Sequence, residues 1–396
     1  MAKLIVCDPA CVQSFGHNLT AVTYYREAFG RFYDDVIIVG CSVLNPAVAE
    51  ENAIKPFYRF YYSEYFHNIN GVDRSVDDDR EGLLYYPDEL EWKATRDAID
   101  LIKAFNVTAE DSIIFPHLDF YGVVGMLSAV AKLRPADRPK LHLRFIGVME
   151  NATNVYRRPL EELLVRLREA FVHGLQIRLS AETPRYADYL ALKLGQVVTV
   201  TLFPNSSQQM PLNEAGPFVF YCPGSARHDK GFGDLEGIFK AVRRRDPDLK
   251  IRFISQILAG SDMKHFGAQA RSLYSIPGVE LQPSSISVQL MRSTYRRTHA
   301  VLLPYAPDVY HWRGSAVQME AAAVGRLAIA YDDMAFSDLI RFYNSGLVVK
   351  DQDAMVEAIF TLAATPRDEL SARATQARHR INTDCSSSFR KWMEYS

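Results

Sequence analysis

The sequence predicts an α/β protein of two domains, each built on a doubly wound parallel sheet. Its 396 residues are more than twice the roughly 150 residues of a typical domain. Short β-branched runs alternate with helical patterns in both halves of the chain, and this alternation is typical of parallel sheets. A polar stretch bounded by Pro204 and Pro211 separates the halves. We therefore expect two α/β domains joined near residue 210.

In the first half, four β-branched runs bounded by turn or polar residues predict strands. Between the first two runs, Leu19, Val22 and Phe29 have a helical spacing. The expected elements are strands at Leu4–Cys7, Val36–Gly40, Ser112–Phe115 and Leu141–Val148, and a helix at His17–Phe29.

The second half repeats the alternation after the polar stretch. A strand-like run at Val198–Phe203 comes just before that stretch. The expected strands are Phe218–Cys222, Lys250–Ser255, Ala300–Leu303 and Leu327–Tyr331, and the expected helices are Phe232–Val242, Ala316–Val324, Asp353–Ala364 and Arg367–Arg380.

These elements predict an N-terminal domain over 1–208, a C-terminal domain over 209–375 and a helical tail over 376–396 that returns to the first domain. Residues 50–90 break the rhythm and are expected to form an insertion, with aromatic side chains concentrated over Phe57–Phe66. Aromatic residues at this density usually pack in a core. Docking at a lipid interface, as a peripheral membrane contact, is the alternative.

Charge and cysteine content exclude several classes of protein. Lys plus Arg number 45 and Asp plus Glu number 47, a net charge of −2 that argues against a nucleic-acid binder. No apolar run reaches the roughly 18 residues of a membrane span. The chain begins with a strand-like segment rather than a secretory leader, so we expect a cytoplasmic protein. The five cysteines form no CxxC pair and no metal-ligand spacing, so no metal is expected.

The loop after the strand at Phe218–Cys222 concentrates positive charge at the start of a helix. Arg227, His228 and Lys230 come directly before the helical stretch Phe232–Val242. Cations at a helix N-terminus oppose the helix dipole. The arrangement becomes favourable when an anion binds both to these side chains and to the free backbone N–H groups. The loop is therefore a candidate anion site, and a solvated turn is the alternative.

A second candidate anion site lies at the start of the helix Ala316–Val324. Gly314 and Ser315 offer free backbone N–H groups there, and Arg313 precedes them. Glu320 flanks the apolar face of this helix and needs a polar partner if it is buried. A ligand hydroxyl is one such partner, and exposure to solvent is the alternative. Both candidate sites follow strands, so we expect them at the carboxyl edge of one sheet.

Two residues of the first half are weaker candidates. Gly16 lies at the first strand-to-helix junction but is not part of a GxGxxG fingerprint, and a tight turn explains it equally well. His117 ends a predicted strand in Phe115-Pro116-His117, where a histidine can face a ligand cleft or simply lie at the surface.

The chain resembles the large family of retaining glycosyltransferases, family 4 type, that includes glycogen and sucrose synthases. Gly224–Phe232 is similar to the family loop whose basic residues hold the donor diphosphate. Glu320–Gly325 resembles the second half of the family's Glu-x7-Glu motif, in which the glutamate contacts the nucleotide ribose, and Ser337–Val349 resembles the segment that follows it. The resemblance covers most of the chain and is strongest over Gly216–Val349.

The resemblance implies the GT-B fold, in which two Rossmann-like domains face one another across a cleft. It implies transfer of a hexose, without a metal and with retention of configuration, from a nucleotide-diphosphate sugar to a glycan or lipid-linked acceptor in polysaccharide or glycoconjugate biosynthesis. Cations would stabilise the diphosphate leaving group. The implied catalytic residues are Lys230, Arg227 and His117, and the implied donor-binding residues are Gly16, Arg313, Gly314, Ser315 and Glu320.

Two positions depart from the family pattern. Trp312 stands eight residues before Glu320, where the family has its first glutamate. Ser225 stands where the loop arginine is usual, and Arg227 follows two positions later. These departures favour an alternative, a GT-B-like protein that binds a nucleotide sugar without transferring it or serves as a partner in a glycan-assembly complex.

Overall fold

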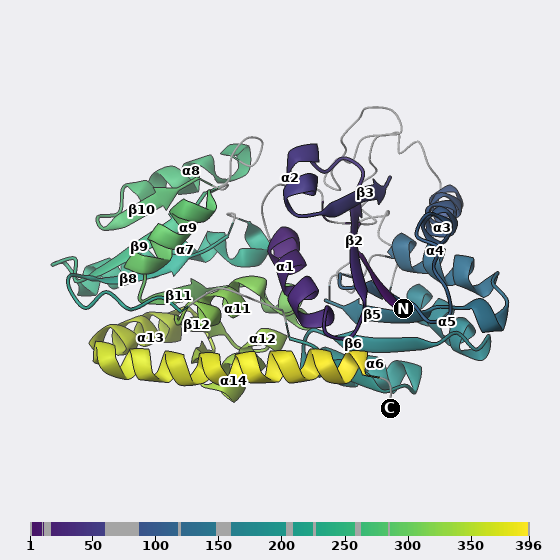
Figure 1. Ribbon diagram of the computed structural model, residues 1–396. Coiled ribbons are helices and arrows are strands. Elements are labelled where there is room, and N and C mark those ends of the chain that lie inside the picture. The colour runs from purple at the N-terminus through teal and green to yellow at the C-terminus, as the bar shows by residue number, and fades with distance from the viewer. Residues whose placement is uncertain are drawn as a thin grey trace. The chain divides into compact units, whose positions relative to one another are not determined.

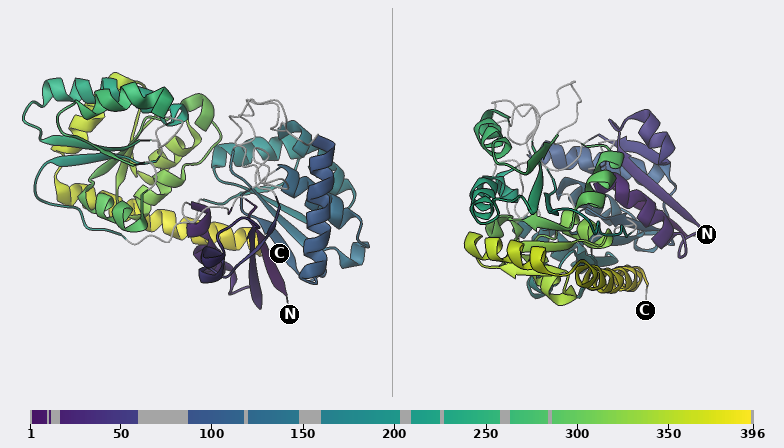
Figure 2. Two further views of the ribbon diagram at one scale, coloured as in Figure 1. Left: turned by 90° about the horizontal axis from the view of Figure 1, so that it is seen from above. Right: turned by 90° about the vertical axis from the view of Figure 1, so that its left-hand side faces the viewer.

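The computed structural model describes residues 2–9, 11, 17–59, 87–117, 120–147, 160–202, 209–224, 227–257, 263–283 and 286–394. The chain forms two compact units (Figure 1). The first unit contains Met1–Pro204 together with Ser386–Ser396, and the second contains Asn205–Cys385. Each unit is built on one parallel sheet with helices on both faces (Figure 2).

Among the described residues, the sheet of the first unit has seven parallel strands in the order β3-β2-β1-β4-β5-β6-β7. Its central strands are buried along most of their length because helices cover both faces. The strands are β1 (Lys3–Cys7), β2 (Asp35–Cys41), β3 (Ile54–Tyr58), β4 (Ser112–Phe115), β5 (Lys140–Phe145), β6 (Ile177–Ala181) and β7 (Val198–Val200). The helices are α1 (His17–Phe29), α2 (Pro46–Glu51), α3 (Pro87–Ala104), α4 (Phe120–Ala131), α5 (Leu160–Val172) and α6 (Pro184–Leu194).

In the part of the second unit that the structure describes, the sheet has six parallel strands in the order β10-β9-β8-β11-β12-β13, the order of a dinucleotide-binding doubly wound fold. The strands are β8 (Phe218–Cys222), β9 (Ile251–Gln256), β10 (Val279–Gln282), β11 (Ala300–Leu303), β12 (Leu327–Tyr331) and β13 (Gly346–Val349). The helices are α7 (Leu235–Arg245), α8 (Met263–Tyr274), α9 (Val288–Arg297), α10 (Pro307–Tyr310), α11 (Ala316–Ala323), α12 (Ala335–Tyr343), α13 (Gln352–Ala364) and α14 (Arg367–Met393).

Successive residues of these strands alternate between two cores, one on each face of the second sheet. Phe220 of β8 packs with α7, α8 and α13 on one face. The next residue, Tyr221, packs with α9, α10, α11 and α12 on the other. Because helices cover both faces of the sheet, the strands are continuous apolar runs in the sequence. Such runs, alternating with helical patterns, are the reason that the sequence predicts a parallel sheet.

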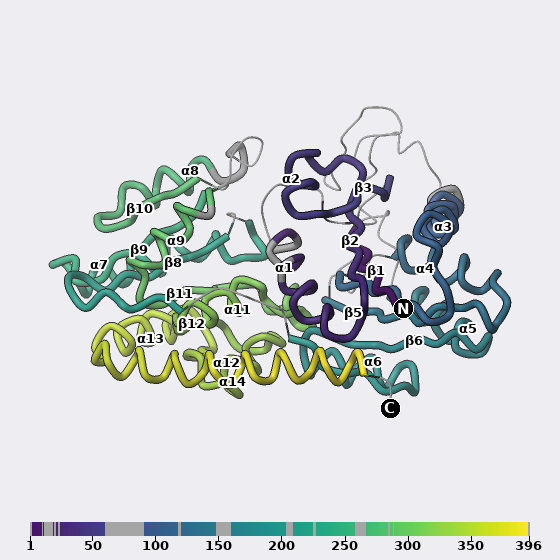
Figure 3. The backbone as a smooth tube through the Cα atoms, in the orientation of Figure 1, coloured from purple at the N-terminus to yellow at the C-terminus, as the bar shows by residue number. Residues whose placement is uncertain are grey.

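Helix α14 belongs to both units and is one uninterrupted helix (Figure 3). Near its start, Leu370 and Ala374 join the core of the second unit. Near its end, the Phe389 ring lies 5.4 Å from the Tyr24 ring, and the indole N–H of Trp392 donates a hydrogen bond to a backbone carbonyl of β6. The helical tail expected at 376–396 is thus the later part of a longer helix.

Most predicted elements are confirmed, and the expected fold class is the observed one. The segment 50–90 differs at both ends from the expected insertion. Ile54–Tyr58 is the edge strand β3, and Pro56 is tolerated there because one side of an edge strand needs no ladder N–H. Helix α3 begins at Pro87. Residues 60–86, which hold most of the aromatic segment, lie outside the described residues.

None of the helices in the described residues combines the length and the apolar character needed to cross a bilayer. Within the same residues, His, Cys, Asp and Glu side chains nowhere gather in threes in a way that would hold a metal ion.

Candidate functional site

The loop after β8 turns sharply and packs against the residue that follows β11. Gly231 has φ +66°, and its N–H donates a 2.9 Å hydrogen bond to the carbonyl of His228. A Cβ at Gly231 would overlap the carbonyl oxygen of Pro304. Since β8 and β11 are neighbouring parallel strands, this contact fixes the loop at the carboxyl edge of the second sheet. Ser225 lies outside the described residues.

Lys230 places its ammonium group inside this loop. The side chain fills the space beside Gly224, where a Cβ would overlap Nζ. Nζ also lies 5.9 Å from the centre of the Tyr305 ring. The pKa of Lys230 is lowered to about 8, chiefly by burial and further by the charges of Arg227 and Arg313, while Asp229 acts in the opposite direction. A desolvated ammonium close to two guanidinium groups makes this edge of the sheet a favourable place for an anion.

Asp229 holds the loop to helix α10. Its carboxylate accepts hydrogen bonds from Arg227 at 2.8 Å and from the Tyr310 hydroxyl at 3.3 Å. Its backbone carbonyl accepts from the N–H of Ala306 at 3.0 Å. The Arg313 guanidinium lies 5.0 Å from the centre of the Tyr310 ring. Sequence reasoning missed Asp229 and Tyr310, although Asp229 stands between two of the predicted cations.

The second candidate anion site lies at the N-terminus of α11. Ser315 caps the helix, and its hydroxyl accepts a 3.2 Å hydrogen bond from the N–H of Gln318. On the apolar face, the Glu320 carboxylate accepts a 3.4 Å hydrogen bond from the hydroxyl of Tyr295. Burial raises the pKa of Glu320 to about 7, and the bond from Tyr295 limits the rise. Gly314 directly precedes the cap.

Stability should therefore depend on pH through Glu320. Its folded pKa lies above the ordinary 4.5, so between pH 5 and 7 the unfolded chain releases this proton first. The free energy of unfolding should fall as pH rises through that window, by an amount on the order of 2 kcal/mol. Urea unfolding at pH 5 and pH 7.5 measures the change. In Glu320→Gln this part of the pH dependence should vanish, and an unchanged profile would contradict the prediction.

The side chain of Gln318 is buried in the first turn of α11. It is 1 % exposed, and neither its amide oxygen nor its amide nitrogen makes a hydrogen bond to any residue that the structure describes. An unsatisfied buried polar group costs about 1–3 kcal/mol. A buried amide without hydrogen bonds at this candidate anion site is suited to bind a polar ligand. In the sequence, Gln318 stands three residues after the helix cap Ser315. This spacing predicts a capping box, in which the glutamine is hydrogen-bonded, rather than an amide without a partner.

Replacing Gln318 with leucine should raise the free energy of unfolding of the ligand-free protein by about 1–2 kcal/mol, because two unpaired polar atoms are removed. Thermal or urea unfolding measures the change. The matched control is Gln269→Leu, since the Gln269 amide donates to the carbonyls of Phe232 and Gly233 at 2.8 and 2.9 Å. That variant should lose stability, and a loss in both would count against the unpaired state of Gln318.

In the first unit, His117 lies directly against Asp8. The two side chains are buried, and Nδ1 of His117 is 3.2 Å from a carboxylate oxygen of Asp8. They meet because Asp8 follows β1, His117 follows β4, and these strands are neighbours in the sheet. Asp8 was missed by sequence reasoning, although an aspartate directly after a buried strand is a signal for this edge. Gly16 lies outside the described residues.

The structure thus brings together one group of predicted residues in the second unit. Arg227 and Arg313 are both close enough to Lys230 to lower its pKa. His117 belongs to the first unit and has Asp8 as its neighbour. Trp312, which stands eight residues before Glu320, packs edge-on against the His311 ring at 4.5 Å.

Comparison with known proteins identifies the fold. The sequence matches no family model and no curated protein. Solved structures match along the whole chain. The trehalose-6-phosphate synthase OtsA is 12 % identical, with a TM-score of 0.66 over 99 % of this chain and 97 % of that chain. The chain has the GT-B fold.

Two further solved structures have a similar architecture. The lipopolysaccharide outer core galactosyltransferase WaaB is 14 % identical, with a TM-score of 0.60 over 98 % of this chain and 100 % of that chain. The S. aureus MnaA, solved with UDP, is 14 % identical, with a TM-score of 0.52 over 100 % and 99 %. At these identities the likeness establishes the fold, and the chemistry has to be argued from the residues.

Proposed function

We propose that this GT-B protein is a retaining glycosyltransferase that moves a hexose from a nucleotide-diphosphate sugar to a glycan or lipid-linked acceptor. The observation that carries the proposal is the half-buried Lys230 ammonium, which lies close to the charges of Arg227 and Arg313 at the carboxyl edge of the second sheet. Ligands of doubly wound sheets bind at this edge. OtsA is a trehalose-6-phosphate synthase and WaaB is a galactosyltransferase, and their similarity in fold supports the reaction class.

The residues of the second unit suit a diphosphate leaving group. Negative charge grows on the diphosphate as its bond to the sugar breaks, and Lys230 and Arg227 would neutralise that charge from fixed positions. A bound anion would also favour the charged form of Lys230, whose pKa is lowered in the free protein. These cations supply the neutralisation that a metal ion gives elsewhere, so the proposed reaction needs no metal.

The remaining predicted residues would orient the donor. The N–H groups of Gly314 and Ser315 at the start of α11, with Arg313 beside them, would bind phosphate oxygens. Glu320 would accept a hydrogen bond from a ribose hydroxyl in exchange for the long bond from Tyr295. His117, held by Asp8, would contact the sugar, and Gly16 would allow close approach of the backbone.

Thermal stabilisation tests the donor site. Each of UDP, GDP, ADP and TDP, and their common sugar conjugates, is added with and without EDTA. A ligand at about 100 times its Kd should add about 2.7 kcal/mol to the free energy of unfolding. We expect one nucleotide family to raise the Tm, EDTA to leave the shift unchanged, and Lys230→Ala to abolish it. No shift with any nucleotide would reject the donor site.

A second candidate function is binding of a nucleotide sugar without transfer. Trp312 favours it, because an indole cannot replace the carboxylate that the family has at this position. The two functions separate in a turnover assay, in which release of nucleoside diphosphate from the stabilising donor is followed over time. Sustained release supports the transferase, and binding without release supports the alternative.

A further inference from the structure

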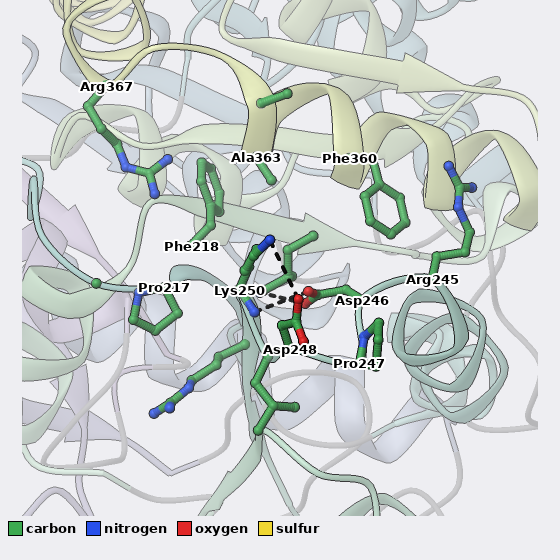
Figure 4. Close-up of a pocket in the computed structure, with 15 residues that line it drawn as sticks. Pro217, Phe218, Arg245, Asp246, Pro247, Asp248, Lys250, Phe360, Ala363 and Arg367 are labelled. Atoms are coloured by element: carbon green, nitrogen blue, oxygen red, sulfur yellow. Dashed lines mark hydrogen bonds and ion pairs between the residues drawn. The ribbon is translucent and has the colours of Figure 1, made fainter.

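A cavity of about 690 Å³ at the amino edge of the second sheet is lined by charges of both signs (Figure 4). Its carboxylates belong to Asp246 and Asp248. The Lys250 ammonium lies 3.6 Å from a carboxylate oxygen of Asp248, and Asp246 accepts hydrogen bonds from the backbone N–H groups of Lys250 and Ile251. Because these groups pair with one another, the lining does not indicate a ligand of particular charge. A buried arginine in the first unit has more specific surroundings.

Arg144 of β5 is completely buried at the carboxyl edge of the first sheet, and all three of its guanidinium nitrogens donate hydrogen bonds. Nη1 donates to the backbone carbonyl of Pro116 at 3.1 Å. Nη2 donates to the carboxylate of Glu182 at 3.2 Å and to the carbonyl of Thr201 at 3.0 Å. Nε donates to the hydroxyl of Thr201 at 3.0 Å. The guanidinium therefore has partners on three other segments of the chain.

Each of these partners comes directly after a different strand. Pro116 follows β4, Glu182 follows β6 and Thr201 follows β7. Together with β5, these are four consecutive strands of one parallel sheet, so their carboxyl ends lie at the same edge. The side chain of Arg144 thus joins the ends of neighbouring strands at the edge where ligands of doubly wound sheets bind.

Stability alone does not explain an ion pair at this place. The cost of removing Arg144 and Glu182 from water offsets much of the attraction between their charges, and a well-packed apolar pair is often at least as stable. Apolar packing is available here, since the guanidinium lies 6.0 Å from the centre of the Phe389 ring. The buried pair is better explained by the geometry that it imposes on the strand ends.

The bond to Pro116 fixes the peptide group that leads into His117. A peptide group is planar, so the carbonyl oxygen of Pro116 and the backbone nitrogen of His117 lie in one plane. Holding that oxygen sets the orientation of the plane, and with it the direction in which His117 leaves the strand. The imidazole itself lies against Asp8, with 3.2 Å between Nδ1 and a carboxylate oxygen. Arg144 therefore holds the backbone at His117, and Asp8 holds the ring.

We propose that Arg144 is a positioning residue for sugar transfer and that it acts by fixing the backbone of His117. This inference rests on the proposed function, in which His117 contacts the transferred sugar. Arg144 does not touch the sugar, because its side chain is fully buried and its nitrogens donate to the protein. A displacement of about 1 Å at a reacting group can lower a rate about 100-fold. Loss of the bond to Pro116 should therefore lower kcat and leave nucleotide affinity unchanged.

A double-mutant cycle of Arg144→Lys with His117→Ala tests this route. Lysine keeps the positive charge beside Glu182, but one ammonium group cannot reproduce the fork of bonds that a guanidinium makes. We expect Arg144→Lys to lower kcat about 10–100-fold and to change the Kd for the nucleoside diphosphate less than about twofold. In the His117→Ala chain the same substitution should change kcat less than about twofold, because the residue through which it acts is gone. An equal loss in both chains, or no loss in either, would overturn the proposal.

Arg138→Lys is the matched control. Arg138 precedes β5 at the opposite edge of the same sheet, and its guanidinium donates to the carbonyls of Leu133, Ala131 and His173 at 3.2, 3.2 and 2.7 Å. This variant removes a similar set of bonds far along the strand from His117, so kcat should stay within about twofold of the unmodified chain. A loss as large as that of Arg144→Lys would attribute the effect to general damage to the sheet and reject the positioning role.

NMR spectra of the chain labelled with ¹⁵N-histidine separate this inference from the proposed function, because they need no donor. The ring signals of His117 and His299 are assigned by their loss in His117→Ala and His299→Gln. In Arg144→Lys the His117 signal should shift or broaden, and the signal of His299, which belongs to the second unit, should not. An unmoved His117 signal rejects the inference even if sugar transfer is observed. A moved signal without transfer by the unmodified chain rejects the proposed function and leaves Arg144 as the residue that positions His117.

Glu182→Gln replaces Arg144→Lys in both experiments if circular dichroism shows that the lysine variant does not fold. It keeps the guanidinium and weakens its charge-assisted bond. We expect kcat to fall about threefold when His117 is present and to stay unchanged in the His117→Ala chain. The His117 ring signal should again move, and a signal that stays in place rejects the proposal.

Discussion

Replacing Lys230 with alanine should lower kcat for sugar transfer by about 10²–10³-fold, with the fold retained. Removal of one fixed electrostatic group from a transition state typically has this effect. Lys230 is held against Gly224 and Tyr305, so its ammonium is positioned before the donor binds. The assay is nucleotide release from the stabilising donor, with the Tm of the ligand-free variant recorded alongside. This prediction rests on the proposed function.

Lys240→Ala is the matched control. Lys240 lies on α7 in the same unit, is exposed, and pairs with Glu236 at 2.5 Å. It should keep full activity. Equal losses in the two variants, or full activity in Lys230→Ala, would remove Lys230 from the mechanism.

The pKa of Lys230 gives the same residue a second, independent signature. In the free protein the pKa is about 8, so the charged fraction falls as pH rises through that value. Nucleotide affinity should fall over the same window, because the anion loses a cationic partner. In Lys230→Arg the guanidinium stays charged and this pH dependence should disappear. Calorimetric titration at pH 7 and pH 9 measures it, and identical profiles for both chains would be the contrary result.

Replacing Gly231 with alanine should destabilise the second unit by about 3 kcal/mol or more. A left-handed backbone costs an alanine about 1–2 kcal/mol. The added Cβ would also overlap the carbonyl oxygen of Pro304, so the loop has to move away from β11. Urea unfolding followed by circular dichroism measures the loss. Nucleotide binding should weaken with it, because the same loop positions Lys230.

Gly233→Ala is the matched control two residues along. A Cβ at Gly233 would meet no atom within 4 Å, and this glycine does not have a left-handed backbone. Its effect should stay within about 0.5 kcal/mol. If Gly231→Ala unfolds at the same urea concentration as Gly233→Ala, the close approach to Pro304 is not a constraint on the fold.

Much of the secondary structure could be predicted from the sequence. The strand at Phe218–Cys222 and the helix at His17–Phe29 have the predicted bounds, because apolar periodicity reports local burial directly. The prediction failed at Ile54–Tyr58, where proline and dense aromatics concealed an edge strand. Proline excludes a central strand but not an edge, and the sequence pattern does not distinguish the two.

The candidate site was predictable in its residue types and not in its contacts. The cations of the loop and the glutamate of α11 stand out in the sequence because they oppose a helix dipole or flank an apolar face. Their partners do not stand out. Tyr295 precedes Glu320 by 25 residues, and Tyr310 follows Asp229 by 81. Nothing local in the chain marks either tyrosine as a partner.

The local sequence pattern was enough to predict two α/β units, each built on a parallel sheet. The reason is that the burial and the backbone preference of a residue show in the pattern of its few nearest neighbours in the sequence. The order of the strands came only from the tertiary structure. That order places Asp8 beside His117, which lies 109 residues later, and seats the loop of Lys230 on the end of β11. Contacts at such separations depend on which strands pair, and pairing is decided by packing of both sheet faces at once.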